Sequence, residues 1–526
     1  MKRRDVIKSL TILPIAGVIG NNSIRSAFSA TPINSEANSR KSIYESIGVV
    51  PLINARGTVT VIGGSRMLPE VKMAMDDAIR DYVQIDELMD GIGRRLAELT
   101  GAESGCITAG ASAAITAATA GCVTGGDPDK IWMIPNITWN KDEVIIPSYS
   151  RSAYDAGAKA AGVRMVQVAD VEELKAALGP RTAMVMVLAG RRSESGPLSL
   201  TEISAITKPL GVPILVDAAA EGLEVPNPHI AQGADLVAYS GGKYLNGPQC
   251  AGLLIGREDL IMAARMNTGP HHGFGRGFKV GREEIMGMLA ATEMWFKRDH
   301  AAEMRQWTLW LEDISDRLAP IPGVSVSIRQ PQGRSNPSPN LRVEWDMDKI
   351  PLTGQDVEKL LWDCNPRIAV SGAGSFLPFP PNTRPNITIN SSQLEAGEEK
   401  IIADRVYGIL SNPVKISKPD GAPAFDVSGQ WDLEMKFSAS TVDQTIVFEQ
   451  KGSNLNGTHF ASIGPRDLTG SIHGTYILVL SSYTLEGVRV NIEFTGHVNG
   501  DKMEGQACLG EYGKATWKAS RRIYRG

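Results

Sequence analysis

The chain has few of the residues that build metal sites and disulfide frameworks. Its 526 residues include 5 cysteines and 7 histidines. The cysteines, at positions 106, 122, 250, 364 and 508, are far apart, form no Cys-x-x-Cys pair and are odd in number. Neither a zinc site nor a set of structural disulfides is therefore indicated, and we expect no metal.

An excess of positive charge is also missing. The chain has 54 Lys and Arg against 58 Asp and Glu, a formal net charge of -4. Proteins that bind the phosphate backbone usually carry a basic surplus, so we expect no nucleic-acid partner. With 42% hydrophobic and 21% charged residues, the composition is that of a globular protein, and the length predicts two or three domains.

No hydrophobic run is long enough to span a membrane. Residues 1–30 combine a basic start, a short apolar stretch interrupted by Pro14, and a small-residue end, whereas a spanning helix needs about 20 apolar residues. This is the pattern of a signal peptide, followed by a linker at residues 31–42. Arg3, Arg4 and Lys8 resemble a twin-arginine signal. We expect an exported, periplasmic protein with no membrane segment in its mature form; an ordinary secretory signal or an uncleaved anchor are the alternatives.

Two α/β segments follow the linker. Residues 43–300 alternate helical stretches with short apolar runs at 144–147, 183–189, 213–217 and 235–240, which predicts a parallel sheet covered by helices. Residues 301–412 mix strand-like pieces with helices at 355–363 and 394–410. They predict a smaller α+β domain, to which the segment 43–60 also belongs.

The end of the chain has a different character. A linker at residues 413–424 precedes a segment, 425–522, in which glycines interrupt alternating apolar and polar residues. This pattern predicts a closed antiparallel β-barrel of about eight strands. His459, His473 and His497 match no metal-ligand spacing, and we expect them at solvent-facing strand positions.

Two predicted strands end in groups that carry chemistry. The run 213–217 ends at Asp217, and the run 235–240 ends at Ser240, three residues before Lys243. Because ligands bind at the carboxyl ends of strands in an open parallel sheet, Asp217 and Lys243 should face one crevice. A partly desolvated lysine has a lowered pKa and condenses with an aldehyde, and a carboxylate keeps a pyridine nitrogen protonated. The pair therefore predicts pyridoxal 5'-phosphate as the cofactor.

A phosphate site is predicted where a helix begins after Gly110. Gly110 and Ala111 offer backbone amides at the positive end of the helix, and Ser112 offers a hydroxyl. Ser240 is a second candidate hydroxyl donor, and Ala219, two residues after Asp217, joins the predicted cofactor-binding set.

With these residues in place, the chain resembles a known family. The signature Ser-Gly-x-Lys-x-x-x-Gly-Pro-Gln is matched by residues 240–249, and residues 42–412 resemble the fold type I pyridoxal phosphate enzymes of the selenocysteine synthase (L-seryl-tRNA(Sec) selenium transferase) branch, which also holds D-glucosaminate-6-phosphate ammonia-lyase. The resemblance implies a large and a small domain, a homodimer or larger homo-oligomer with shared active sites, Lys243 as the Schiff-base lysine and Asp217 as the ring-nitrogen partner. Selenium transfer to a tRNA is not expected, because the chain is slightly acidic and carries an export signal.

The chain departs from the family at the group that stacks on the cofactor ring. Relatives commonly place a histidine after the strand matched here by 144–146, and residues 147–154 contain none. Tyr149 is the candidate replacement, and a smaller covering group is the alternative.

Several cations are candidates for binding a substrate carboxylate or phosphate. They are Arg384 before the predicted strand 385–390, Arg191 and Arg192 after the strand 183–189, Arg56 in the amino-terminal motif, and His272 in a glycine-rich loop. For each of them an ordinary surface or loop position is the alternative.

These residues together predict a pyridoxal phosphate-dependent lyase. Lys243 would remove the Cα proton of an amino acid or amino-sugar acid, and β-elimination would expel the leaving group on Cβ. Hydrolysis of the resulting enamine would then give a 2-oxo acid and ammonia. Racemisation, transamination and aldol cleavage begin with related steps and stay open. A non-enzymatic alternative is an inactive scaffold whose β-domain binds a ligand or partner.

Overall fold

The computed structural model describes residues 42–372, 384–414, 416, 419–485 and 488–522. Buried apolar side chains form three separate clusters in this part of the chain: one from residues 89–288, one from 53–55 with 311–410, and one from 427–519. The predicted signal peptide lies outside the described residues, as does the linker that follows it except for Ser42. No helix of the described residues is long and apolar enough to cross a membrane.

A seven-stranded sheet carries the first cluster. Its strand order is β2-β8-β7-β6-β5-β3-β4. The strands are β2 (Ser104–Thr108), β3 (Glu143–Pro147), β4 (Arg164–Val168), β5 (Thr182–Leu188), β6 (Ile214–Asp217), β7 (Leu236–Ser240) and β8 (Gly252–Gly256). The strands predicted at 144–147, 183–189, 213–217 and 235–240 are all present.

The sheet is mixed, which corrects the expectation of a parallel one. β8 runs antiparallel to both of its neighbours, β2 and β7, whereas the other pairs are parallel. The connection from Ser240 to Gly252 holds only turns and is too short for the helical crossover that a parallel pair requires, so the chain returns in the opposite direction.

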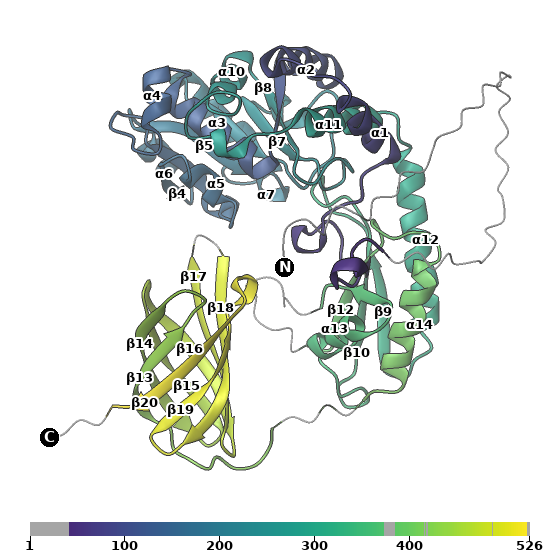
Figure 1. Ribbon diagram of the computed structural model, residues 1–526, viewed down its shortest axis with the longest axis vertical. Helices are drawn as coiled ribbons and strands as arrows, with labels where there is room; N and C mark the ends of the chain where they lie inside the picture. Colours follow the sequence, from purple (N-terminus) through teal and green to yellow (C-terminus); the bar gives the residue numbers. More distant parts are fainter. Residues whose placement is uncertain (1–41, 373–383, 415, 417–418, 486–487, 523–526) are drawn as a thin grey trace, which may run out of the picture. The chain divides into compact units, whose positions relative to one another are not determined.

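Helices lie on both faces of this sheet (Figure 1). They are α1 (Pro69–Ala78), α2 (Ile85–Thr100), α3 (Ala111–Thr124), α4 (Pro128–Met133), α5 (Asp155–Lys159), α6 (Val171–Ala177), α7 (Arg191–Glu194), α8 (Leu200–Thr207), α9 (Pro228–Ala231), α10 (Glu258–Met266) and α11 (Arg282–Trp295). α3 consists almost entirely of small or β-branched residues and is mostly buried. A Cβ on its Gly121 would lie 2.7 Å from the backbone nitrogen of Ala264, so the small residues let α3 pack closely on α10.

The second cluster lies in a smaller α/β unit. An antiparallel sheet of order β12-β10-β9 consists of β9 (Val324–Arg329), β10 (Asn340–Trp345) and β12 (Asn386–Asn390). β1 (Leu52–Asn54) pairs in parallel with β11 (Arg367–Ala369). The helices are α12 (His300–Leu318), α13 (Gly354–Asp363) and α14 (Glu398–Ser411), and α12 packs beside α14 (Figure 1). Ile53 of β1 is buried in this cluster, as the predicted association of the amino-terminal segment requires.

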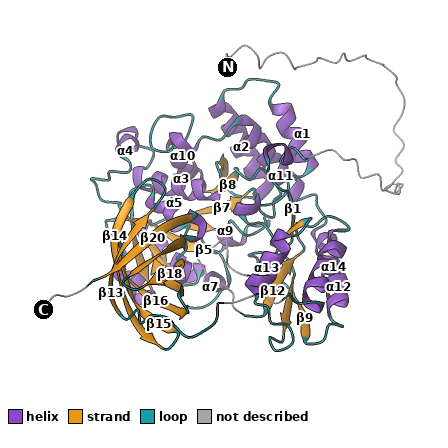
Figure 2. Cartoon of the chain, turned by 60° about the horizontal axis from the view of Figure 1, so that its bottom comes forward, coloured by secondary structure: helices purple, strands orange, loops and turns teal. Residues whose placement is uncertain are grey.

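Strands between residues 429 and 521 form the predicted eight-stranded barrel (Figures 1 and 2). Each strand is antiparallel to the next, and β20 pairs with β13 to close the sheet. The strands are β13 (Gly429–Lys436), β14 (Thr441–Lys451), β15 (Asn454–Ala461), β16 (Gly464–His473), β17 (Tyr476–Leu485), β18 (Val488–Asn499), β19 (Lys502–Cys508) and β20 (Lys514–Arg521). Short 3-10 turns occur at Glu45–Ile47, Thr60–Ile62, Ser148–Ser150, Lys208–Leu210, Arg276–Phe278 and Gly510–Tyr512.

One barrel histidine contradicts the expectation of solvent-facing positions. His497 is exposed and His473 is half-buried, but His459 is fully buried. His459 shares its side of β15 with the buried Leu455, because residues at even spacing on a strand face the same way. The prediction of a solvent-facing position is therefore wrong for His459, which lies on the inward face of β15.

Candidate active site

Asp217 and Lys243 lie at the ends of two adjacent parallel strands, as the sequence predicts. Asp217 is the last residue of β6, and in the β6–β7 pair it stands opposite Ala238. Lys243 follows the end of β7 by three residues. Asp217 is 3% exposed, and its Oδ1 accepts a hydrogen bond from the backbone amide of Ala219 at 3.1 Å. The structure thus brings Lys243, Asp217 and Ala219 together.

The two groups influence each other's protonation. Burial lowers the pKa of the Lys243 amine, and the negative charge of Asp217 partly opposes that shift. Burial also raises the pKa of the Asp217 carboxyl, against the Ala219 amide and the Lys243 charge, which both lower it. A neutral amine, the form that attacks an aldehyde, is therefore more populated on Lys243 than on a lysine in water.

The glycines around Lys243 are required by the tight loop that holds it. A Cβ on Gly241 would lie 2.6 Å from the Met288 sulfur, and one on Gly242 would lie 2.7 Å from the Gln249 Cα. The Gly241 amide donates to the Ala251 carbonyl at 2.8 Å, and the Gly247 amide donates to the Gly241 carbonyl at 2.8 Å. The spacing of the Ser-Gly-x-Lys signature thus reflects a closed loop that fixes where the lysine begins.

The predicted phosphate site is the amino end of α3. Gly110 precedes the helix with φ +92°, a conformation that favours glycine, and no side chain caps the helix. Ser112, in its first turn, is exposed. Gly252 of β8 pairs with Ser240, and a Cβ on Gly252 would lie 2.7 Å from the Ala111 nitrogen. Ser240 and the uncapped start of α3 are thus neighbours. Ser240 also precedes Lys243 by three residues in the chain.

Tyr154, rather than Tyr149, faces the lysine. The Lys243 Nζ lies 6.0 Å from the centre of the Tyr154 ring, and burial together with the Asp217 charge raises the pKa of Tyr154. The Tyr149 hydroxyl instead donates to the Leu198 carbonyl at 2.6 Å, and burial raises its pKa to about 12. Both tyrosines lie in the stretch that lacks the family's histidine. The sequence does not reveal that the chain after the turn at Ser148–Ser150 places Tyr154 near Lys243. The stacking role of Tyr149 remains a prediction.

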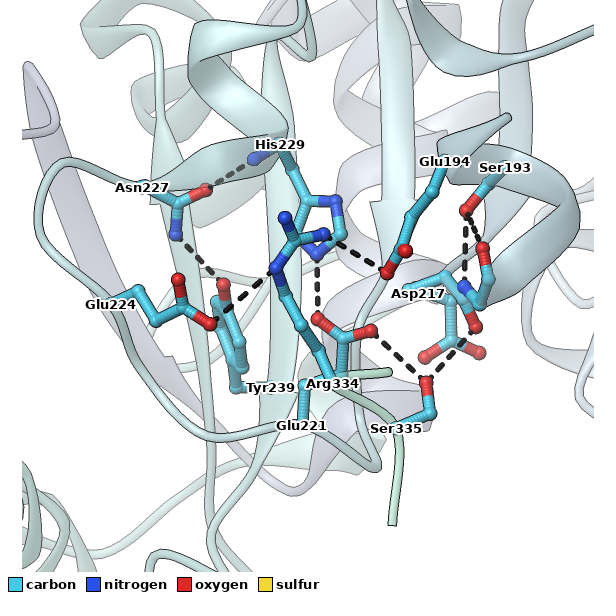
Figure 3. Close-up of polar contacts among 12 residues, drawn as sticks. Ser193, Glu194, Asp217, Glu221, Glu224, Asn227, His229, Tyr239, Arg334 and Ser335 are labelled. Atoms are coloured by element: carbon cyan, nitrogen blue, oxygen red, sulfur yellow. Dashed lines mark hydrogen bonds and ion pairs between the residues drawn. The ribbon is translucent and has the colours of Figure 1, made fainter. Parts of the chain in front are cut away.

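A buried polar network behind Asp217 could not be read from the sequence (Figure 3). The Glu221 carboxylate is 1% exposed and accepts hydrogen bonds from His229 Nε2 at 2.7 Å and Ser335 Oγ at 3.0 Å. Its charge contributes to the raised pKa of Asp217. Beside it, Arg334 forms ion pairs with Glu194 at 3.0 Å and Glu224 at 3.4 Å. Ser335 and Arg334 belong to the segment between β9 and β10. The network therefore connects that segment to the residues that follow β5 and β6.

The predicted substrate-binding cations have different surroundings. Arg191 is exposed and donates to Gln332 at 3.2 Å, so it contacts the same segment as the network behind Asp217. Arg192, Arg384 and His272 are exposed, the last in the loop before Arg276–Phe278. Arg56 is half-buried, and burial lowers its pKa while Glu358 opposes the shift. Arg191 is the candidate with the clearest structural link to Asp217, and the roles of all five remain predictions.

The donor set suits pyridoxal phosphate. It offers an amine of lowered pKa for the aldehyde, a buried carboxylate for the ring nitrogen, and uncapped helix amides with hydroxyls for the phosphate. Lys243, Asp217, Ser240 and the first residues of α3 would hold the cofactor.

Comparisons with known proteins agree with this chemistry. Residues 81–273 match the family described as Cys/Met metabolism PLP-dependent enzyme. The chain is 30% identical over 330 residues to D-glucosaminate-6-phosphate ammonia lyase of Salmonella typhimurium, covering 61% of this chain and 86% of that protein. It is 32% identical over 299 residues to a 5'-C-glycyluridine monooxygenase-decarboxylase of a Streptomyces species, covering 55% and 73% of the two chains.

Two further matches extend the comparison. An L-seryl-tRNA(Sec) selenium transferase of Rhizobium meliloti is 28% identical over 315 residues, which cover 53% of this chain and 64% of that protein. The solved structure of a D-glucosaminate-6-phosphate ammonia-lyase superposes with a TM-score of 0.61 at 27% identity, covering 70% of this chain and 98% of the other. The resemblance seen in the Ser-Gly-x-Lys signature therefore extends over most of the α/β part.

Proposed function

Because the chain belongs to the family of pyridoxal phosphate-dependent enzymes that includes D-glucosaminate-6-phosphate ammonia lyase, we propose that it is a lyase that eliminates ammonia from an amino acid or amino-sugar acid. The observation that carries the proposal is the pairing of Lys243 with Asp217 at two adjacent strand ends, with the opposed pKa shifts that burial imposes on them.

Each residue of the site has a task in this reaction. The cofactor, when bound, supplies an electron sink for the negative charge that develops at the substrate Cα. Lys243 would hold the cofactor and, once its amine is free, would take the proton from Cα through Nζ. Asp217 would keep a proton on the cofactor's ring nitrogen. Tyr154 places its ring on one side of the lysine, with the ring centre 6.0 Å from Nζ.

The proposed substrate class is tested by product analysis. The reconstituted enzyme is incubated with a panel of β-hydroxy amino acids, D-glucosaminate and D-glucosaminate 6-phosphate, and ammonia and 2-oxo acid are measured. We expect equal amounts of the two products from at least one member of the panel. Racemised substrate without ammonia would refute elimination, and an amino group passed to an added 2-oxo acid would indicate an aminotransferase.

We also propose that the mature protein is exported and forms a homodimer. The twin-arginine-like signal supports export. Several large apolar side chains between residues 61 and 83 are exposed in the single chain, which supports a partner on this segment. They are Val61, Met67, Met73, Ile79, Tyr82 and Val83. Light scattering of the purified protein measures the mass, and amino-terminal sequencing of the protein from the periplasm finds the cleavage site.

A further inference from the structure

The interior of the β-barrel is apolar at one end and polar at the other. Alternate residues of each strand face inward, and at one end they are large apolar side chains such as Trp431, Phe448 and Ile472. At the end that holds the turns after β13, β15 and β19, the inward positions carry polar groups. These are Gln444, His459, Arg466, Ser481 and Tyr483.

His459 is a neutral member of this polar set. It is fully buried, with Nδ1 2.8 Å from Ser481 Oγ and Nε2 2.7 Å from Gln444 Oε1. Since the Gln444 oxygen only accepts, Nε2 carries the proton, and Nδ1 accepts from the serine hydroxyl. Burial, and next the charge of Arg466, lower the pKa of His459 to about 4, so the ring adds no charge near pH 7.

Arg466 is the charged member and has no counter-ion. It stands directly opposite His459 in the β15–β16 pair, and its guanidinium lies 4.2 Å from the centre of the Tyr483 ring. Its Nε is buried without a hydrogen-bond partner, and it forms no ion pair within the described part of the chain. Burial lowers the pKa of the guanidinium. None of the inward-facing positions described on the eight strands holds an aspartate or glutamate.

Arg521, another inward-facing arginine of the barrel, has the charge and hydrogen-bond partners that Arg466 lacks among the described residues. Arg521, at the apolar end, lies 4.5 Å from the centre of the Trp431 ring, just as Arg466 lies against Tyr483. Arg521, however, is paired with Asp501 at 2.9 Å and donates to the Ser428 carbonyl at 2.5 Å. A partly buried cation without such partners is costly, and an anion that supplied them would be bound strongly.

We propose that the polar end of the barrel is a binding site for a small organic carboxylate, which the Arg466 guanidinium holds through its free Nε and an adjacent amino group. The planar fork of a guanidinium matches two carboxylate oxygens. The Tyr483 ring lies against the guanidinium, with its centre 4.2 Å from Cζ. Both ring nitrogens of His459 are already hydrogen-bonded to Ser481 and Gln444. The ring therefore lines the site but offers no acceptor to the Arg466 guanidinium.

The test is calorimetric titration of the full-length protein with benzoate, with benzamide as the uncharged probe of the same shape. Wild type and Arg489→Met, which removes an exposed arginine from the outer face of β18, should bind benzoate equally. Arg466→Met should bind it at least about tenfold more weakly, because a charged hydrogen-bonded pair is lost. Benzamide should bind all three proteins no better than Arg466→Met binds benzoate.

A second measurement separates a binding role from a structural one. Without benzoate, the barrel of Arg466→Met should melt at the same temperature as wild type or higher, since the substitution removes a partly buried charge that has no ion-pair partner in the part of the chain that the structure describes. Absence of benzoate binding to wild type, equal binding by Arg466→Met, or a lower melting temperature for that variant would each overturn the proposal.

Discussion

At the scale of single residues, Lys243 is the group on which the proposed chemistry depends. We expect Lys243→Ala to lose the visible absorbance of a lysine-bound cofactor and to lower ammonia release by at least about 10²–10⁴-fold, because the amine both holds the cofactor and moves the Cα proton. Absorbance spectra after reconstitution and an ammonia assay measure the two effects. Lys297→Ala, which changes an exposed lysine, serves as the control. An unchanged spectrum for Lys243→Ala would assign the cofactor to another lysine.

Asp217 should affect stability in opposite directions without and with cofactor. Its folded pKa is raised by burial, so its favourable contribution is present at low pH and is lost as pH rises through that pKa. Without cofactor, Asp217→Asn should therefore melt at a higher temperature than wild type, and the difference should be smaller near pH 5 than near pH 8. With cofactor, the variant should gain less in melting temperature than wild type, since it lacks the partner of the ring nitrogen. Thermal melts at both pH values test this; a variant less stable than wild type at pH 8 without cofactor would contradict it.

The sequence predicts the residues of this site that depend on local pattern and misses those that depend on tertiary contact. Lys243 and Asp217 follow recognisable strands, so their common edge could be inferred. Glu221 and His229 are eight residues apart in an irregular stretch, and Ser335 is more distant still; nothing in their spacing indicates that they share buried hydrogen bonds. Tyr154 was missed for the same reason.

At the scale of elements, β8 sets the position of the start of α3. A Cβ on Gly252 would lie 2.6 Å from the Gly110 carbonyl carbon and 2.8 Å from the Tyr239 oxygen, all backbone atoms that cannot rotate away. We expect Gly252→Ala to cost about 1–3 kcal/mol of stability and to weaken cofactor binding, because the helix amides must shift. Denaturant unfolding and a cofactor titration measure the two effects.

A glycine in open space provides the matched control. Nothing lies within 4 Å of a Cβ built on Gly408 in α14, so Gly408→Ala should stabilise the chain by up to about 1 kcal/mol and leave cofactor affinity unchanged. Equal effects of the two substitutions would show that β8 does not position α3.

The elements themselves were largely predictable, and the strand direction that was not is that of β8. The apolar runs at 183–189 and 213–217 correspond closely to β5 and β6, because a buried strand between turn residues has a clear pattern. The antiparallel course of β8 has no such signal, since an apolar run reads the same in either direction. The buried position of His459 could not be inferred from the alternation along β15, because polar residues occupy both faces of that strand.

At the scale of the whole molecule, the barrel closes its own hydrogen bonding and has its own apolar cluster. We expect calorimetry of the full chain to show two unfolding transitions. Cofactor should raise the temperature of the α/β transition only, since a ligand stabilises the unit that binds it. A variant ending at residue 423 should keep the cofactor-sensitive transition and lose the other. A single transition that moves as a whole with cofactor would contradict this independence.

The pairing of Leu52 with Arg367 sets the order in which the smaller α/β unit can be completed. During synthesis, β1 leaves the ribosome long before β11 exists, and Ile53 has no strand partner until more than half of the chain has been translated. The nascent protein must therefore hold this segment unpaired through most of its elongation, which makes it a natural place for a chaperone to act.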